Sequence, residues 1–540
     1  MGLAMAFFVS ACFLISVCAL YAFIWSIGNE SQEDHTPRAD MIFDKGELGR
    51  VEDPALDDKT TSEISKAADL RSSEDIRERI LFDTSSRLPV LAFISSALFW
   101  LVIGSLAGLL ASFKLHMPDL WTGAAELTFG RVRPVHLNAV AYGWGSMAGI
   151  GIVLWLLPRI LKTPLVGSKF AVASAAVWNL ALTIGLTQLL LGMTDGKEFL
   201  EIPWTTDILF VLGGGLAAVP LFLTLLNKKA GHIYVSGWYF SAALVWFPLL
   251  FLMGNMPGLF YGAEQAILNW WFGHNVLGLW VTPIAVGTAY YFIPKILGVP
   301  VHSYRLSLIG FWSLALFYSQ VGVHHLIGGP VPYWLQTLSI VQSVMMIVPV
   351  AAFTFNMFTI TRKNFGIMKS SFTLRFILIG AVCYLLSSVQ GSLEAVRAMN
   401  YLVHFTHYTV AHAHLGLYSF FTMILFGAIY FVVPRATGVN WVRPKLISLH
   451  FWLVFIGMLI YIVFLTIGGI VQGLALQDPN IPFGESTAVS LPYLEWRSVG
   501  GTLMTFGHLV IAYHLYIHLR HVKRLKFSNV PTPQRKEVTS

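Results

Sequence analysis

Charged residues are scarce in this chain of 540 residues. Asp, Glu, Lys and Arg together make up 12% of the sequence, whereas hydrophobic residues make up 56%. Soluble domains carry about 25% charged residues, so this composition excludes an ordinary soluble protein. It favours a chain that lies mostly within a lipid bilayer.

Cysteine is scarcer still. The only three, Cys12, Cys18 and Cys383, all lie in apolar segments. Such a set supplies neither a disulfide framework nor a zinc site built on thiolates. The C-x-x-C-H motif is also missing, so the chain carries no covalently attached c-type haem.

Long apolar runs, by contrast, are abundant. About thirteen can cross a hydrocarbon core of roughly 30 Å as helices that rise about 1.5 Å per residue. The run at 3–27 has no cleavage site after it, which favours an uncleaved membrane anchor at 1–27. The others form a core at 88–520, with spans near 88–112, 134–157, 168–192, 205–227, 234–254, 264–292, 305–328, 334–358, 371–395, 404–433, 446–472 and 499–520. We therefore expect an all-α polytopic membrane protein with a twelve-helix core and one extra N-terminal transmembrane helix.

Basic residues collect in alternate connections between these spans, such as Arg159 with Lys162 and Arg362 with Lys363. Cytoplasmic loops of membrane proteins are enriched in Lys and Arg, so both ends of the core are expected in the cytoplasm, with a basic tail at 521–540. The same rule accounts for the formal net charge of +7 without a nucleic-acid partner.

Residues 28–87 form the one long polar stretch, and most of the acidic residues fall there. Low hydrophobicity with mixed charge is typical of disorder. We expect a solvated, acidic cytoplasmic linker, with a short helix near Ser73 to Arg79.

Two histidines, His412 and His414, lie one residue apart near the outer start of the tenth core span. On a helix, such positions project from nearly opposite faces, so one metal ion cannot easily bind both. Imidazole is a usual axial ligand of haem iron, and ionisable residues within a membrane read as functional by default. We favour a helix shared by two haems over the alternative, a pair of hydrogen-bonded core histidines.

Four more histidines fall at the same depth on other helices: His136, His274, His324 and His325. His136 could complete a six-coordinate haem with one member of the H-x-H pair, which leaves the second haem open. The other three could share a metal, and three imidazoles without thiolate or carboxylate suit copper, zinc or iron. An open haem facing such a metal is a site for a small diatomic molecule.

Tyr318 precedes His325 by seven residues, so we expect the two to share a helix face about two turns apart. A phenol there could deliver a proton and an electron to bound oxygen. The alternative is an ordinary buried tyrosine with a hydrogen bond.

Several stretches resemble the catalytic subunit of cbb3-type cytochrome c oxidases, the C family of haem–copper oxidases. They are FGRVRPVHLNAVAYGW (129–144), WWFGHNVLGLWVTP (270–283), YYFIPK (290–295), HSYRLS (302–307), GVHHL (322–326) and HAHLG (412–416). The resemblance covers roughly residues 88 to 520. It implies a haem–copper oxidase core in a bacterial cytoplasmic (inner) membrane, with two haem b groups and one copper ion, and leaves room for calcium.

The resemblance also implies roles for individual residues. His136 and His414 would hold the low-spin haem b, and His412 would be the proximal ligand of the high-spin haem. The copper ligands it implies are His274, His324 and His325, with Tyr318 matching the family's tyrosine that is cross-linked to the ligand at position 274. Arg131 and Arg133 match arginines expected near the haem propionates.

The chain departs from the family in two places. Gln390-Gly391-Ser392 stands where the family usually has Glu-Gly-Pro, with Glu394 one turn later, and His407 stands where an aspartate is expected. These departures bear on the propionates, calcium and proton exit, and leave the metal ligands intact. Residues 1–87 lie outside the resemblance to the core and are faintly similar to the small assembly protein of these oxidases, which suggests a fusion.

The implied function is a terminal oxidase. Electrons from membrane-anchored c-type cytochrome subunits would pass through haem b to the haem–copper site, where O2 becomes water and protons are taken up and translocated. Buried polar residues of the inner half are candidates for proton uptake, with hydrogen bonding between helices as the alternative; they include Thr282, Tyr290, Tyr291 and Ser313.

Two other functions are weighed against it. A nitric oxide reductase with non-haem iron needs an added carboxylate one turn after the first metal histidine, and that position is Gly278. A non-catalytic di-haem electron conduit needs haems in opposite halves of the bilayer, whereas these histidines share one depth. It would also leave His274, His324 and His325 without a purpose.

Overall fold

The computed structural model describes residues 36–44, 46–55 and 73–528, with a few isolated positions between residues 10 and 24. Apart from one isolated bridge between Lys197 and Leu200, the described residues form no β-structure. The predicted all-α class is confirmed. Most of the predicted anchor at 1–27 and the end of the basic tail lie outside the described residues.

Ten helical spans within the described residues are long and apolar enough to cross a membrane. Six are single helices: α4 (Ser73–Lys114), α7 (Ser168–Leu190), α8 (Trp204–Leu226), α9 (Val235–Gly254), α15 (Phe372–Ala395) and α19 (Lys445–Gln477). A seventh joins α13 (Tyr333–Met345) to α14 (Ile347–Thr361). With α12 (Tyr304–Tyr318) and α21 (Leu491–Ser528), which pack against them, the bundle has the twelve elements predicted for the core.

The remaining three spans each contain a π-helical segment. They are α5 (Phe129–Asn138), η2 (Ala139–Ser146) and α6 (Met147–Leu161); α10 (Ala263–Asn275), η3 (Val276–Val281) and α11 (Thr282–Leu297); and α17 (His407–His414), η6 (Leu415–Thr422) and α18 (Met423–Thr437). These spans carry His136, His274 and the H-x-H pair, each just before its π segment. π-Bulges are found frequently at functional sites.

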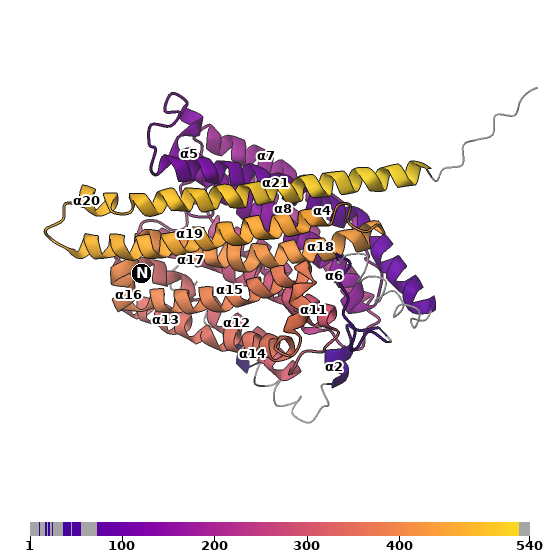
Figure 1. The fold of residues 1–540 in the computed structure, drawn as a ribbon. Coiled ribbons are helices and arrows are strands. Elements are labelled where there is room, and N and C mark those ends of the chain that lie inside the picture. Colours follow the sequence, from indigo (N-terminus) through magenta and orange to yellow (C-terminus); the bar gives the residue numbers. More distant parts are fainter. Residues whose placement is uncertain are drawn as a thin grey trace, which may run out of the picture.

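The same three spans lie at the centre of the bundle. In their most apolar windows, 89%, 94% and 83% of the residues are buried, against 39–56% in the other seven spans. The outer helices surround them, and α21 packs against both α19 and α4, which brings the last helix of the core next to the first (Figure 1). Histidines on the central spans are therefore shielded from lipid.

The predicted seventh span at 305–328 is not one helix. α12 ends at Tyr318, and the 3-10 helix η4 (Val321–Leu326) carries His324 and His325. The expectation that Tyr318 and His325 share one helix face is therefore wrong. The break lets η4 pack against α10, where a side chain at Gly322 would overlap the backbone of Trp270.

Short elements complete the part of the chain that the structure describes. They are α2 (Thr36–Asp40), η1 (Ala125–Leu127), η5 (Phe365–Lys369), α16 (Arg397–Val403) and α20 (Phe483–Ala488).

The expectation of a solvated linker is wrong for residues 36–44 and 46–55, which dock on one end of the bundle (Figure 1). Lys295 of α11 pairs with Glu47 at 2.5 Å and donates to the Ile42 carbonyl at 2.8 Å. Arg79 of α4 pairs with Asp44 at 2.6 Å, so the linker carboxylates neutralise basic helix ends. We call this end of the bundle the linker face.

The docked segment is also held on the bundle by a backbone hydrogen bond and by the buried carboxyl group of Asp53. The Gly49 N–H donates to the Gly298 carbonyl at 2.8 Å, and Gly298 has a left-handed φ of +66°. Asp53 accepts hydrogen bonds from Thr373 at 2.9 Å and from Ser371. Burial raises the pKa of Asp53 despite these bonds. The predicted short helix near Ser73 to Arg79 is the first part of α4.

Candidate metal centre

One cavity of about 750 Å³ is lined by all six histidines that the sequence singles out. It lies between the three central spans and η4, and the walls include apolar side chains such as Leu109, Val140 and Phe421. A large apolar space with a few convergent polar groups is the usual form of a cofactor site.

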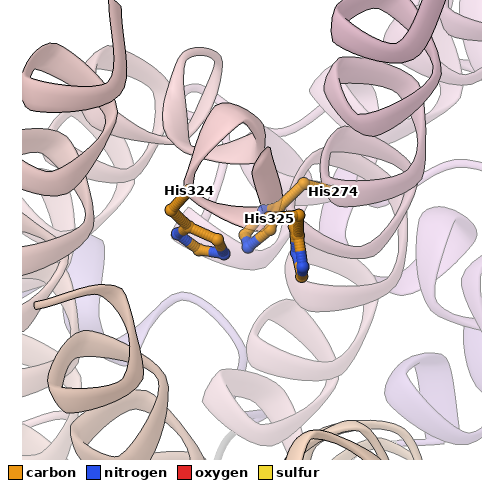
Figure 2. Close-up of side chains that lie close together, drawn as sticks. All are labelled: His274, His324 and His325. Carbon is orange, nitrogen blue, oxygen red and sulfur yellow. The ribbon is translucent and has the colours of Figure 1, made fainter. Parts of the chain in front are cut away.

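Three of the histidines form a compact cluster at one wall (Figure 2). The candidate ligand atoms of His274, His324 and His325 all lie within 4.8 Å of one another. The ring centroids are 4.7 Å apart for His274 and His324, and 4.4 Å apart for His324 and His325. This spacing places three imidazoles around one point, as a single metal ion requires.

Neighbouring groups hold these imidazoles in place. Nδ1 of His324 is 2.8 Å from the Ser343 hydroxyl, which leaves its Nε2 for a metal. His325 stacks on Trp270 with centroids 4.0 Å apart. Nδ1 of His274 is buried and has no hydrogen-bond partner in the described chain. Metal-binding histidines are usually fixed by a second partner of this kind, and a buried ring nitrogen without a partner needs a ligand.

Tyr318 lies beside the cluster. Its ring centroid is 5.0 Å from that of His274, and a side chain at Gly278 would overlap the Tyr318 ring. The phenol therefore fills the place in which a carboxylate at position 278 would stand. The hydroxyl of Thr282, which also lines the cavity, donates to the Leu277 carbonyl at 3.0 Å in the π segment η3.

His136 and His414 face each other across another part of the cavity. Their rings are nearly parallel, at 10°, with centroids 6.4 Å apart. Two imidazoles that face each other in this way would fit a haem iron between them. The Nδ1 atoms are fixed by carbonyl groups, that of Gly104 for His136 and that of Val410 for His414, each at 2.8 Å.

The Tyr461 hydroxyl contacts the ring nitrogen of His414 that a haem would need. This hydroxyl lies 3.2 Å from Nε2 of His414 and accepts a hydrogen bond from Nε of Arg497 at 2.9 Å. A haem bound between His136 and His414 would replace the contact from Tyr461 to His414.

His412 projects toward α15. Nδ1 of His412 has no hydrogen-bond partner among the described residues, and a Cβ at Gly391 would lie 2.7 Å from its ring. The glycine of the sequence Gln390-Gly391-Ser392 thus allows α15 to approach His412. The residues present fit two planar cofactors and one metal ion, and the ligand roles themselves stay predictions.

The two predicted propionate arginines lie in different places. Arg133 lines the cavity and pairs with Glu198 at 2.6 Å. Arg131 donates to the Leu190 carbonyl at 2.8 Å and is not part of the lining. Their roles stay predictions.

Arg497, which the sequence shows only as a basic residue in an outer connection, is buried in α21 and also lines the cavity. The long helix α21 begins at Leu491, before the predicted start at 499, and this is why the sequence did not reveal Arg497.

The departures from the family pattern also gather here. Glu394 and His407 line the cavity, and the Gln390 side-chain oxygen is buried without a partner in the described chain. The hydroxyl of Ser392 donates to the Ser343 carbonyl at 2.9 Å, so this segment is tied to the residue that holds His324.

Comparison with known proteins agrees with this geometry. The family model for cytochrome c and quinol oxidase polypeptide I matches residues 89–503. The chain is 32% identical over 444 residues to the cbb3-type cytochrome c oxidase subunit CcoN1 of Stutzerimonas stutzeri, covering 79% of this chain and 94% of that one. It is 31% identical over 447 residues to cytochrome c oxidase subunit 1 of Rhodobacter capsulatus, covering 79% and 84%.

A cryo-EM structure of a haem–copper terminal oxidase dimer has the same fold, with a TM-score of 0.67 and 17% identity over 80% of this chain and 84% of that one. The chain therefore belongs to the cytochrome c and quinol oxidase polypeptide I family, as a cbb3-type haem–copper oxidase subunit.

Proposed function

We propose that this chain is the O2-reducing subunit of a cbb3-type terminal oxidase in a bacterial cytoplasmic membrane. The observation that carries the proposal is the cluster of His274, His324 and His325, which supplies three imidazoles and no carboxylate. Such a ligand set suits copper. His412 lines the same cavity and would hold the haem that faces this metal.

The cofactors we propose are one copper ion at this cluster, a high-spin haem b on His412 and a low-spin haem b between His136 and His414. When bound, they would supply the electron transfer and the O2 chemistry. Arg133 and Arg497 are the candidates to pair with haem propionates, because both guanidinium groups line the cavity. Calcium stays a prediction.

The chain itself would orient the cofactors, exclude bulk water and hold a proton. Ser343 and Trp270 fix two of the metal-binding imidazoles. Tyr318 would hold a proton and an electron at its phenol oxygen, next to His274. The reaction consumes protons together with electrons, so a proton donor within the cavity is needed.

Electrons would come from membrane-anchored c-type cytochrome subunits, since this chain lacks the C-x-x-C-H motif. The linker face carries the basic helix ends Lys295, Arg79 and Arg435. By the positive-inside rule we assign it to the cytoplasm, from which protons would be taken up.

Nitric oxide reduction is the second candidate, and the contact between Tyr318 and Gly278 argues against it. Iron in that chemistry would need a carboxylate at position 278, and the Tyr318 ring fills this space. A di-haem conduit is less favoured, because it assigns no role to the cluster of three histidines.

The test compares substrates on the purified complex supplied with a chemical reductant. We expect rapid O2 consumption, with consumption of nitric oxide at least about tenfold slower. His325→Ala should abolish O2 reduction while the low-spin haem spectrum remains, and the exposed His302→Ala serves as the matched control. Faster consumption of nitric oxide than of O2, or loss of both haem signals in His325→Ala, would overturn the proposal.

A further inference from the structure

Four histidines on α19 and α21 have no part in the proposed oxygen chemistry. His450, His508, His514 and His518 are at most 4% exposed. Buried ionisable side chains at membrane depth are costly and mark ion pathways and proton relays. We call these four residues the histidine ladder.

One end of the ladder lies at the cavity that the six candidate ligand histidines line. His508 lines this cavity. Its Nδ1 is 2.7 Å from the Ser105 hydroxyl, and its Nε2 is 2.8 Å from the Tyr418 hydroxyl. Tyr418 lies one helical turn after His414, so both ring nitrogens of His508 are engaged by hydroxyl groups next to the proposed low-spin haem site.

His450 continues the series from the facing helix. It lies against α21 beside His508, because a Cβ at Gly507 would be 3.4 Å from Cδ2 of His450. The Phe426 ring contacts both imidazoles, with centroids 4.5 Å from His450 and 5.8 Å from His508. Nδ1 of His450 is 3.0 Å from the Tyr430 hydroxyl, and its Nε2 is buried without a partner in the described chain.

His514 and His518 carry the series to the linker face. The His514 ring centroid is 6.0 Å from that of Tyr430, and the Trp441 ring lies 4.5 Å from His514 and 4.7 Å from His518. Nε2 of His514 donates to the Val442 carbonyl at 2.6 Å, and Nε2 of His518 is 3.0 Å from the Thr437 hydroxyl.

Neither Nδ1 of His514 nor Nδ1 of His518 has a partner among the described residues. One turn further along α21, the side chain of His521 is exposed.

The ladder is long enough to cross half of the membrane. His508 and His518 are ten residues apart on α21, which is about 15 Å along a helix and about half of a hydrocarbon core of roughly 30 Å. The hydrogen bonds recorded for the ladder go to hydroxyl groups and one carbonyl group, not to carboxylates. No carboxylate in these bonds would hold a ring as a permanent imidazolium.

We propose that the histidine ladder, with Tyr430 and Tyr418, conducts protons from the linker face to the cavity beside His414. Each imidazole accepts a proton at one nitrogen and releases one from the other, and rotation of the ring restores the starting tautomer. One proton enters at His518 and one leaves at His508, with no net chemical change. Internal water, the common partner of buried polar groups, would bridge the successive rings. The inference rests on the proposed function in one respect only, namely that haems bind in the cavity.

The test measures proton uptake when the purified, haem-loaded complex is reduced, with a pH dye in a stopped-flow instrument. His514→Leu removes the relay. His514→Gln keeps a donor for the Val442 carbonyl but cannot carry a proton. We expect both variants to slow proton uptake by about tenfold or more, with the haem spectrum unchanged. The controls are Tyr516→Phe, whose side chain is 55% exposed on the same helix, and His302→Gln.

Uptake within about twofold of the parent protein in both variants would overturn the inference, and so would recovery in His514→Gln alone, which indicates a structural role. If a His514 variant loses its haem, Tyr430→Phe carries the test, since it removes only the hydroxyl next to His450. The readout here is proton uptake on reduction. Failure of the proposed oxygen chemistry would instead appear as an unexpected haem or metal content, or as a preference for nitric oxide over O2. The two failures are therefore distinguishable.

Discussion

The ring of Tyr318 occupies the space that a side chain at Gly278 would need. One glycine in a π segment thus lets a phenol approach His274 within 5.0 Å between ring centroids. The same contact excludes a carboxylate at position 278. Gly278, which would bind nothing itself, therefore bears on which metal ion we propose for the three histidines.

Gly278→Ala is the first test of this relationship. The new methyl group would push the phenol away from His274, and overpacking of a filled site costs about 1–3 kcal/mol. We expect loss of O2 reduction by at least about tenfold with both haem signals retained. Gly215→Ala is the matched control, because a Cβ there meets nothing within 4 Å. Near-parental turnover in Gly278→Ala would show that the position of Tyr318 is unimportant.

Tyr318→Phe tests the phenol itself. The ring and its packing against Gly278 are retained, so we expect copper and haem contents to be unchanged. Removal of the proton donor should lower turnover by about 100-fold or more. Metal analysis and O2 consumption on the same preparation provide the check. Normal activity would remove Tyr318 from the mechanism and leave it as a packing residue.

Lys295→Met tests the docking of residues 36–44 and 46–55. Lys295 and Glu47 form a pair 2.5 Å apart, with side chains 7% and 6% exposed. Breaking a buried pair by removing one partner costs about 3–5 kcal/mol. We expect the segment to detach and to become sensitive to limited proteolysis, while the haem spectrum stays unchanged. The exposed Lys363→Met is the control, and equal protease resistance in both variants would contradict the docking.

A pH effect is expected at Glu201, in the loop between α7 and α8. Burial, with the charge of Glu198 second, raises the pKa of Glu201 from 4.5 to about 7. The folded protein therefore holds this proton more tightly than the unfolded chain does. The contribution to stability is complete below pH 4.5 and is lost as pH rises toward 7.

Glu201→Gln keeps an acceptor for the Asn138 amide, which lies 2.9 Å from the carboxylate. We expect the variant to be more stable than the parent at pH 8, by up to about 3 kcal/mol, and equally stable at pH 4. Thermal unfolding of the detergent-solubilised complex at both values is the measurement. A stability difference that does not change with pH would show that Glu201 titrates normally.

The sequence predicted the core and the six histidines because these depend on local patterns. Apolar length sets the spans, and the H-x-H and His-His pairs have fixed spacing in the chain. Two kinds of feature could not be found in this way. The π segments after His136, His274 and His414, and the end of α12 at Tyr318, depend on packing between helices rather than on local propensity.

The docked segment was missed for a related reason. Its carboxylates read as solvated charges, because their partners Lys295 and Arg435 lie more than 200 residues away in the chain. Likewise Arg497 lies near the start of α21, and its long-range partner is the Tyr461 hydroxyl of α19. Long-range partners of this kind leave no periodic signal in a single sequence.

The central claim is that His274, His324 and His325 bind copper. The direct measurement is copper and total iron in the purified complex, with haem iron and the c-type haems of partner subunits counted separately. We predict about one copper per catalytic subunit and no iron beyond that in haem. His324→Ala should remove the copper and leave the haem iron. Iron in excess of haem, with no copper, would contradict the account and would assign the site to non-haem iron despite the contact between Tyr318 and Gly278.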